Sequence, residues 1–126
     1  MKRIIMTLLV GLSASSTWAG PVVEIYTCEL HEGKTLADVN NMVSEFRQML
    51  EKAGLQDAYT AHVGFQQLPI RPNSVNWIGI APSGEAFGAI TDWFNGSEDG
   101  AAFGSLYTSI YTCDHSFLTH VTASSK

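Results

Sequence analysis

The chain has 126 residues and a formal net charge of −5 at pH 7, with 45% hydrophobic and 15% charged side chains. The acidic surplus repels phosphate, which argues against nucleic-acid binding and against attachment to anionic membranes. The length is typical of a single domain with a hydrophobic core of its own.

The N-terminal segment has the three parts of a secretory signal peptide. Lys2 and Arg3 precede an apolar run over residues 4–12, and small and polar residues then lead to Ala19. This run is too short to span a bilayer, so the segment is interpreted as a cleavable signal peptide. Cleavage after Ala19 is predicted, which leaves residues 20–126 as one mature domain. Loss of Lys2 and Arg3 leaves five basic against twelve acidic side chains, a net charge of −7. The predicted location is periplasmic or secreted, with no membrane anchor after cleavage.

The first half of the mature chain predicts a strand, a helix and a second strand. Residues Val22–Leu30 are rich in β-branched and aromatic side chains that alternate along the chain, as strands do. Apolar residues then recur at helical spacing over Leu36–Ala53, after a cap-like Thr35 and before a helix-ending Gly54. Residues Tyr59–Gln67 alternate again and form the second predicted strand.

The second half predicts a loop, a strand, an interrupted helix and a last strand. Two prolines place residues 68–73 in a loop, and residues Ser74–Ala81 form the third predicted strand. A helical region follows, is interrupted near Asn95-Gly96, and starts afresh at Ser97 with two carboxylates behind it. Residues Ser116–Ala123 form the fourth predicted strand.

The order of these elements, βαββαβ, predicts an α+β, ferredoxin-like fold. In that fold a four-stranded antiparallel sheet has its helices on one face, and the first strand lies centrally, antiparallel to the fourth. By element order the chain resembles the dimeric α/β-barrel superfamily, and this resemblance implies a homodimer joined through open sheet faces. Through the Trp77-Ile78-Gly79 strand, the Pro82-Ser83-Gly84 turn and its two cysteines, it also resembles small exported proteobacterial proteins of unassigned function.

Two cysteines test this arrangement. Cys28 lies near the end of the first predicted strand and Cys113 just before the fourth, and antiparallel pairing brings those ends together. In an oxidising compartment such a pair predicts a structural disulfide. Two buried free thiols are the plain alternative. A Cys₂His₂ metal site with His31 and His115 is another, but the spacing resembles no standard site, and no metal or cofactor is predicted.

The sheet face turned away from the helices carries the candidate site. If Val63 and Ile78 point to the helices, the period of two sends five polar and aromatic residues to the other side. These residues are Glu24, Tyr26, His62, Trp77 and His120. Such side chains suit a dimer interface, a pocket for a small aromatic or oxygenated ligand, or a solvated face. Glu24 with His62 or His120 is the acid/base pair that an enzyme would use here.

Two classes of function remain. The chain has no nucleophile elbow, phosphate-binding loop, dinucleotide fingerprint or zinc-protease motif. This favours an exported, non-catalytic homodimer that binds a small molecule or an envelope protein. The alternative, which the resemblance to the dimeric α/β-barrel superfamily implies, is a cofactor-free, monooxygenase- or cyclase-like enzyme acting on a small aromatic or polyketide-like compound.

Overall fold

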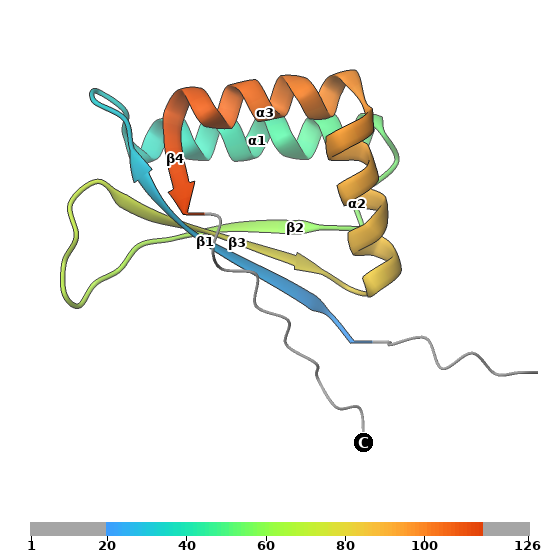
Figure 1. The fold of residues 1–126 in the computed structure, drawn as a ribbon, viewed down its shortest axis with the longest axis horizontal. Coiled ribbons are helices and arrows are strands. Elements are labelled where there is room, and N and C mark those ends of the chain that lie inside the picture. Colours follow the sequence, from blue (N-terminus) through green and yellow to red (C-terminus); the bar gives the residue numbers. More distant parts are fainter. Residues whose placement is uncertain (1–19, 115–126) are drawn as a thin grey trace, which may run out of the picture.

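The structure, a computed structural model, describes residues 20–114; residues 1–19 and 115–126 lie outside the described part (Figure 1). In chain order its elements are β1 (Val22–Leu30), α1 (Leu36–Lys52), β2 (Thr60–Gly64), β3 (Ser74–Ala81), α2 (Gly84–Gly96), α3 (Glu98–Ile110) and β4 (Tyr111–Asp114). The four strands form one antiparallel sheet in the order β2-β3-β1-β4. This is the predicted ferredoxin-like fold, with β1 central and antiparallel to β4.

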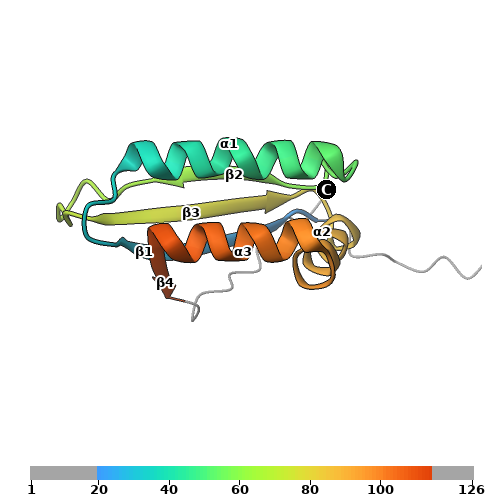
Figure 2. The same ribbon diagram turned by 90° about the horizontal axis from the view of Figure 1, so that it is seen from above.

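The helices cover one face of the sheet. α1 and α3 run side by side above it, and α2 descends at one end towards the strands (Figures 1 and 2). The core lies between these helices and the sheet, around Phe46 of α1, Trp77 of β3 and Phe103 of α3. None of the helices within residues 20–114 is both long and apolar enough to cross a membrane.

The first helix begins and ends at the residues that its sequence indicates. The Thr35 backbone N–H donates to a carboxylate oxygen of Asp38 at 2.8 Å, which satisfies one of the free donors at the helix start. Gly54 has a φ of 71°, the left-handed conformation that glycine adopts without strain, and it follows the last turn. Four apolar residues of α1 are buried against the sheet and α3, namely Val39, Met42, Phe46 and Leu50.

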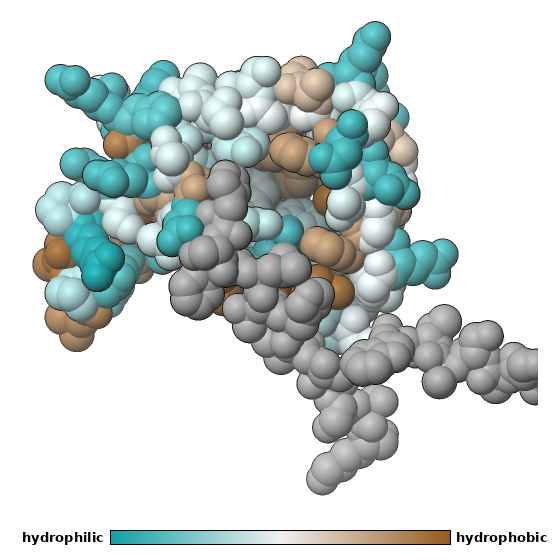
Figure 3. Space-filling model, viewed as in Figure 1, coloured by the Kyte–Doolittle hydropathy of each residue, from teal (hydrophilic) through white to brown (hydrophobic). Residues whose placement is uncertain are grey.

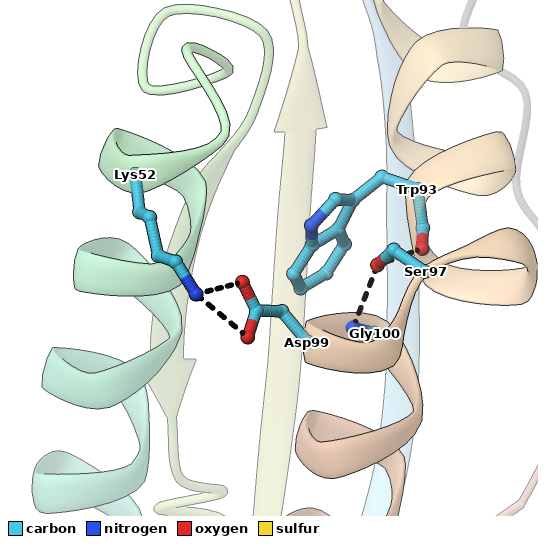
Figure 4. Close-up of polar contacts among 5 residues, drawn as sticks. All are labelled: Lys52, Trp93, Ser97, Asp99 and Gly100. Atoms are coloured by element: carbon cyan, nitrogen blue, oxygen red, sulfur yellow. Dashed lines mark hydrogen bonds and ion pairs between the residues drawn. The ribbon is translucent and has the colours of Figure 1, made fainter.

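The predicted helix interruption is confirmed, and Ser97 makes it (Figure 4). Its hydroxyl donates to the Trp93 carbonyl at 2.7 Å, ending α2, and accepts the Gly100 N–H at 2.9 Å, starting α3. A side chain at Gly100 would overlap the α2 backbone, so the two helices meet closely there. Lys52 at the end of α1 contacts Asp99 at 2.8 Å, but the lysine is 73% exposed, so this ion pair contributes little stability.

The disulfide is confirmed, but the last strand differs from the prediction. Cys28 and Cys113 are bonded, and they lie directly opposite each other in the β1–β4 ladder. β4 therefore contains Cys113 and begins at Tyr111, where α3 passes into extended backbone without a loop. The strand predicted at Ser116–Ala123 lies outside the described residues. β2 is also shorter than predicted, over Thr60–Gly64.

The predicted orientation of the third strand is wrong. Trp77 is only 8% exposed and packs edge-on against Phe46, 5.4 Å between ring centroids, so it faces the helices. Ile78 and Ile80 face the open side instead. Both sides of β3 are apolar, so its alternation shows which residues share a side and leaves the choice of side to packing. The large indole fills the space beneath α1 and α3, which isoleucine would leave partly empty.

Candidate functional site

A cavity of about 440 Å³ lies between the sheet and helices α2 and α3. Figure 3 shows a hollow in this region, with apolar residues on part of its rim. Ten of its fifteen lining residues are aromatic: Tyr26, Phe46, Tyr59, Trp77, Phe87, Trp93, Phe94, Phe103, Tyr107 and Tyr111. The others are Glu24, Ile90, Thr91, Asn95 and Cys113. The size and the mostly apolar wall with a few polar groups are typical of small-molecule sites.

A chain of hydrogen bonds centres on Glu24. The Tyr26 hydroxyl donates to Glu24 Oε1 at 2.8 Å, and the Tyr59 hydroxyl donates to Oε2 at 2.7 Å. Trp77 Nε1 in turn donates to the Tyr59 hydroxyl at 2.8 Å. Bonds to an ionised carboxylate are stronger than neutral ones, so these donors fix the Glu24 side chain at the cavity wall.

Glycine in the middle of β3 makes this network possible. Gly79 lies opposite Glu24 in the β1–β3 ladder, and its missing side chain leaves room for the Tyr59 ring. A Cβ at this position would overlap the Tyr59 hydroxyl and the ring carbon that carries it. Tyr59 stands just before β2 and is buried, with its ring edge-on to Phe46 at 5.7 Å. Gly79 therefore lets Tyr59 reach across β3 to Glu24.

Three phenols of the cavity, those of Tyr26, Tyr59 and Tyr111, have raised pKa values and stay uncharged at neutral pH. Burial, followed by the hydrogen bond to Glu24 and the negative charge of that residue, raises the pKa of Tyr26 to about 12. Burial, followed by the charge of Glu24, also raises the pKa of Tyr59, and burial followed by Tyr107 raises that of Tyr111. These hydroxyls consequently remain hydrogen-bond donors.

The cavity wall carries a single carboxylate and no cationic side chain within the described part of the chain. Glu24 is its one acidic residue, and no lysine, arginine or histidine of residues 20–114 lines it. Two phenolic hydrogen bonds offset part of the cost of holding a carboxylate beside aromatic rings. The cavity therefore has mostly aromatic walls and one acidic side chain, that of Glu24.

The structure gathers three of the five predicted site residues, but on the other side of the sheet from the one predicted. Glu24, Tyr26 and Trp77 line the cavity on the helix side. His62 is exposed and pairs with Ile78 across the β2–β3 ladder, so it lies on the open side. The sheet therefore separates Glu24 from His62, and that predicted acid/base pair is wrong. His120 lies outside the described residues.

Sequence reasoning missed Tyr59 and the aromatic residues of α2 and α3. Tyr59 falls at the start of a predicted strand, where nothing in the alternation marks it. One feature does point to it: Gly79 interrupts a strand of bulky residues, and glycine inside a strand often marks close approach of another group. Several aromatic residues of α2 and α3 belong to the hydrophobic core and also line the cavity.

No family model matches the chain, and no curated protein matches its sequence. Similar solved structures include a conserved protein of unknown function and possible oxidoreductase from Bacteroides thetaiotaomicron, 5% identical, covering 76% of this chain and 93% of that one, with a TM-score of 0.49. SnoaB, a cofactor-independent oxygenase from Streptomyces nogalater, is 14% identical over 76% of this chain and 88% of its own, with a TM-score of 0.49. A dimeric, ferredoxin-like protein of unknown function from Bacteroides fragilis is 12% identical over 75% and 93%, with a TM-score of 0.42. At these identities the likeness concerns the fold alone.

Proposed function

We propose that this protein is an exported binding protein for a small, flat, largely apolar molecule. The observation that carries the proposal is the cavity between the sheet and helices α2 and α3, walled by ten aromatic side chains around one carboxylate. Aromatic walls bind planar apolar ligands by burial and ring stacking. Glu24, held by Tyr26 and Tyr59, offers a fixed acceptor that orients a polar group of the ligand.

Tryptophan fluorescence tests binding directly. Of the three tryptophans, Trp18 belongs to the predicted signal peptide, and Trp77 and Trp93 both line the cavity. In the mature protein every tryptophan therefore reports on this site. Titration with the neutral two-ring probe 4-biphenylmethanol is expected to give a saturable change in emission. A change that rises linearly without saturation would argue against a binding cavity.

Two threonines provide a matched pair of variants. Thr91 and Thr108 are exposed helix residues whose hydroxyls each donate to the carbonyl four residues earlier, at 2.9 Å in both cases. Only Thr91 lines the cavity. Thr91→Phe should narrow the cavity and weaken probe binding, whereas Thr108→Phe should leave it unchanged. Equal effects of the two variants would place binding elsewhere on the protein.

Export is part of the proposal. The Cys28–Cys113 disulfide is typical of proteins in oxidising, extracytoplasmic compartments, and residues 1–19 have the pattern of a signal peptide. Mass spectrometry of periplasmic material from expressing cells is expected to show a chain that starts at Gly20. An intact N-terminus recovered from the cytoplasm would contradict export.

We also propose a homodimer joined through the open sheet face. β1 and β3 present an apolar strip there, formed by Val23, Ile25, Ile78 and Ile80, and Ile25 is 38% exposed. The described helices all lie on the other face (Figure 1). Covering apolar surface gains roughly 25 cal/mol per Å², so a second copy stabilises the exposed strip.

A cofactor-free enzyme is the second candidate function. The observation that favours it is a carboxylate inside an aromatic cavity, where Glu24 is in position to take a proton from a bound aromatic or polyketide-like substrate. An enzyme of this kind would lose turnover in Glu24→Gln while still binding its substrate. A binding protein would show no turnover in the wild type.

A further inference from the structure

We infer that the cavity selects organic cations: molecules with an aromatic body and a protonated or quaternary amine that lies against Glu24. This inference rests on the proposed binding function and names the chemical class of the ligand. Three features carry it, namely the use of the cavity's hydrogen-bond donors, the sign of its charge and the nature of its walls.

The donors around Glu24 are already engaged. The hydroxyls of Tyr26 and Tyr59 both donate to the carboxylate, and Trp77 Nε1 donates to the Tyr59 hydroxyl. A carboxylate has about four acceptor positions, and the two phenols use one on each oxygen. The capacity left at this end of the cavity is therefore for accepting, so a matching ligand group must donate. An ammonium group provides up to three such donors.

The charge of the cavity favours a cation over a neutral donor. Glu24 is the acidic residue of the wall, and no lysine, arginine or histidine among the described residues balances it there. In a site partly shielded from water, the attraction between opposite charges is stronger than in bulk solvent. A carboxylate ligand would instead meet Glu24 with like charge and find its donors occupied.

The walls add to the same preference. Aromatic rings have negative faces, which attract a cation within about 6 Å of the ring centroid. Tyr26 and Tyr59 donate to Glu24, and Trp77 donates to Tyr59, so three aromatic side chains of the cavity wall belong to one chain of hydrogen bonds that ends at the carboxylate. The rings of Tyr59 and Trp77 are nearly parallel, with 27° between their planes. A cavity with aromatic walls and one carboxylate is a suitable site for an ammonium group.

A series of three probes with one ring system tests the inference on the mature, disulfide-bonded protein. The probes are 4-biphenylmethylamine, 4-biphenylmethanol and 4-biphenylcarboxylate, which are positive, neutral and negative at pH 7. We expect the amine to bind about tenfold more tightly than the alcohol, as a cation–aromatic contact with a charge partner provides. The carboxylate should bind most weakly. Titration of tryptophan emission gives all three dissociation constants.

Glu24→Gln keeps the shape of the side chain and removes its charge. In this variant the amine should lose about tenfold in affinity and bind about as tightly as the alcohol, which should lose less because it has no charge to pair with Glu24. Glu29→Gln is the matched control, because Glu29 lies on the same strand but is exposed on the open side of the sheet. It removes the same charge from the protein and should leave all three constants unchanged.

The outcomes separate this inference from the proposed function. Equal binding of amine and alcohol to the wild type overturns the cation preference and leaves the cavity as a ligand site. Binding of none of the probes overturns the proposed function itself. An equal loss of amine affinity in Glu24→Gln and Glu29→Gln would assign the cation preference to the net charge of the surface. The same conclusion would follow if the preference disappeared in 0.5 M salt, where the screening length is about 4 Å. The salt series on the wild type decides the matter even if Glu24→Gln does not fold.

Discussion

Replacing Gly79 by alanine places a methyl group where the Tyr59 ring lies. The new Cβ would overlap the Tyr59 hydroxyl and the ring carbon that bears it, and it would also meet a second ring carbon at 2.9 Å. The Tyr59 ring must therefore move away from β3. This movement breaks the hydrogen bond to Glu24 at 2.7 Å and the bond from Trp77 at 2.8 Å.

The size of the effect follows from these contacts. Overfilling a packed core costs about 1–3 kcal/mol, and each lost hydrogen bond costs about 1 kcal/mol net. Alanine offsets part of this, because it is more favourable than glycine in a strand by about 0.5–1 kcal/mol. We therefore expect Gly79→Ala to lower the free energy of unfolding by about 3 kcal/mol, which lowers the melting temperature of a domain of this size by about 15 °C.

Urea unfolding followed by tryptophan emission measures this loss. Gly64→Ala on the neighbouring strand is the control, because a Cβ there meets Ile78 at an ordinary 3.4 Å, and its effect should be small. In a Tyr59→Ala background the clash is gone, so Gly79→Ala should become neutral or stabilising. If it costs as much there as in the wild type, the Tyr59 contact is not the reason for the glycine.

Three further results are expected. Replacing Cys28 and Cys113 by serine should lower the free energy of unfolding by about 4 kcal/mol, measured by urea unfolding, because the bond closes a loop of 85 residues; no change would show that the bond is unimportant for stability. Burial raises the folded-state pKa of Tyr26 to about 12. The stabilising contribution of Tyr26 is therefore complete below the ordinary tyrosine pKa and is lost as the pH rises through 12. An alkaline absorbance titration of Tyr26→Phe should lack one ionisation near 12. Ile25 is exposed on the open sheet face, so Ile25→Glu should convert the proposed homodimer into a folded monomer, as measured by light scattering. Trp77 is buried in the core, so Trp77→Glu should unfold the protein instead. A wild-type monomer at micromolar concentration would refute the dimer.

Local patterns in the sequence were sufficient for the element order, the first helix and the helix break. Thr35, Asp38 and Gly54 act through hydrogen bonds and backbone conformation within a few residues, so their roles follow from neighbouring positions. Ser97 likewise ends one helix and begins the next through bonds to residues three and four positions away. The Cys28–Cys113 bond could be predicted because element order alone brings β1 and β4 together.

Only the tertiary structure decided which side of the sheet faces the helices. Alternation places Glu24 and Tyr26 on one side of β1, and Ile78 and Ile80 on one side of β3. Each strand has apolar or aromatic side chains on both of its sides, so the pattern fits either orientation. The choice depends on filling the space beneath α1 and α3, where the Trp77 indole packs and isoleucine would leave gaps. Tyr59 reaches Glu24 from 35 positions away only because Gly79 leaves room between them. Such contacts depend on volumes in three dimensions, which a pattern along the chain does not contain.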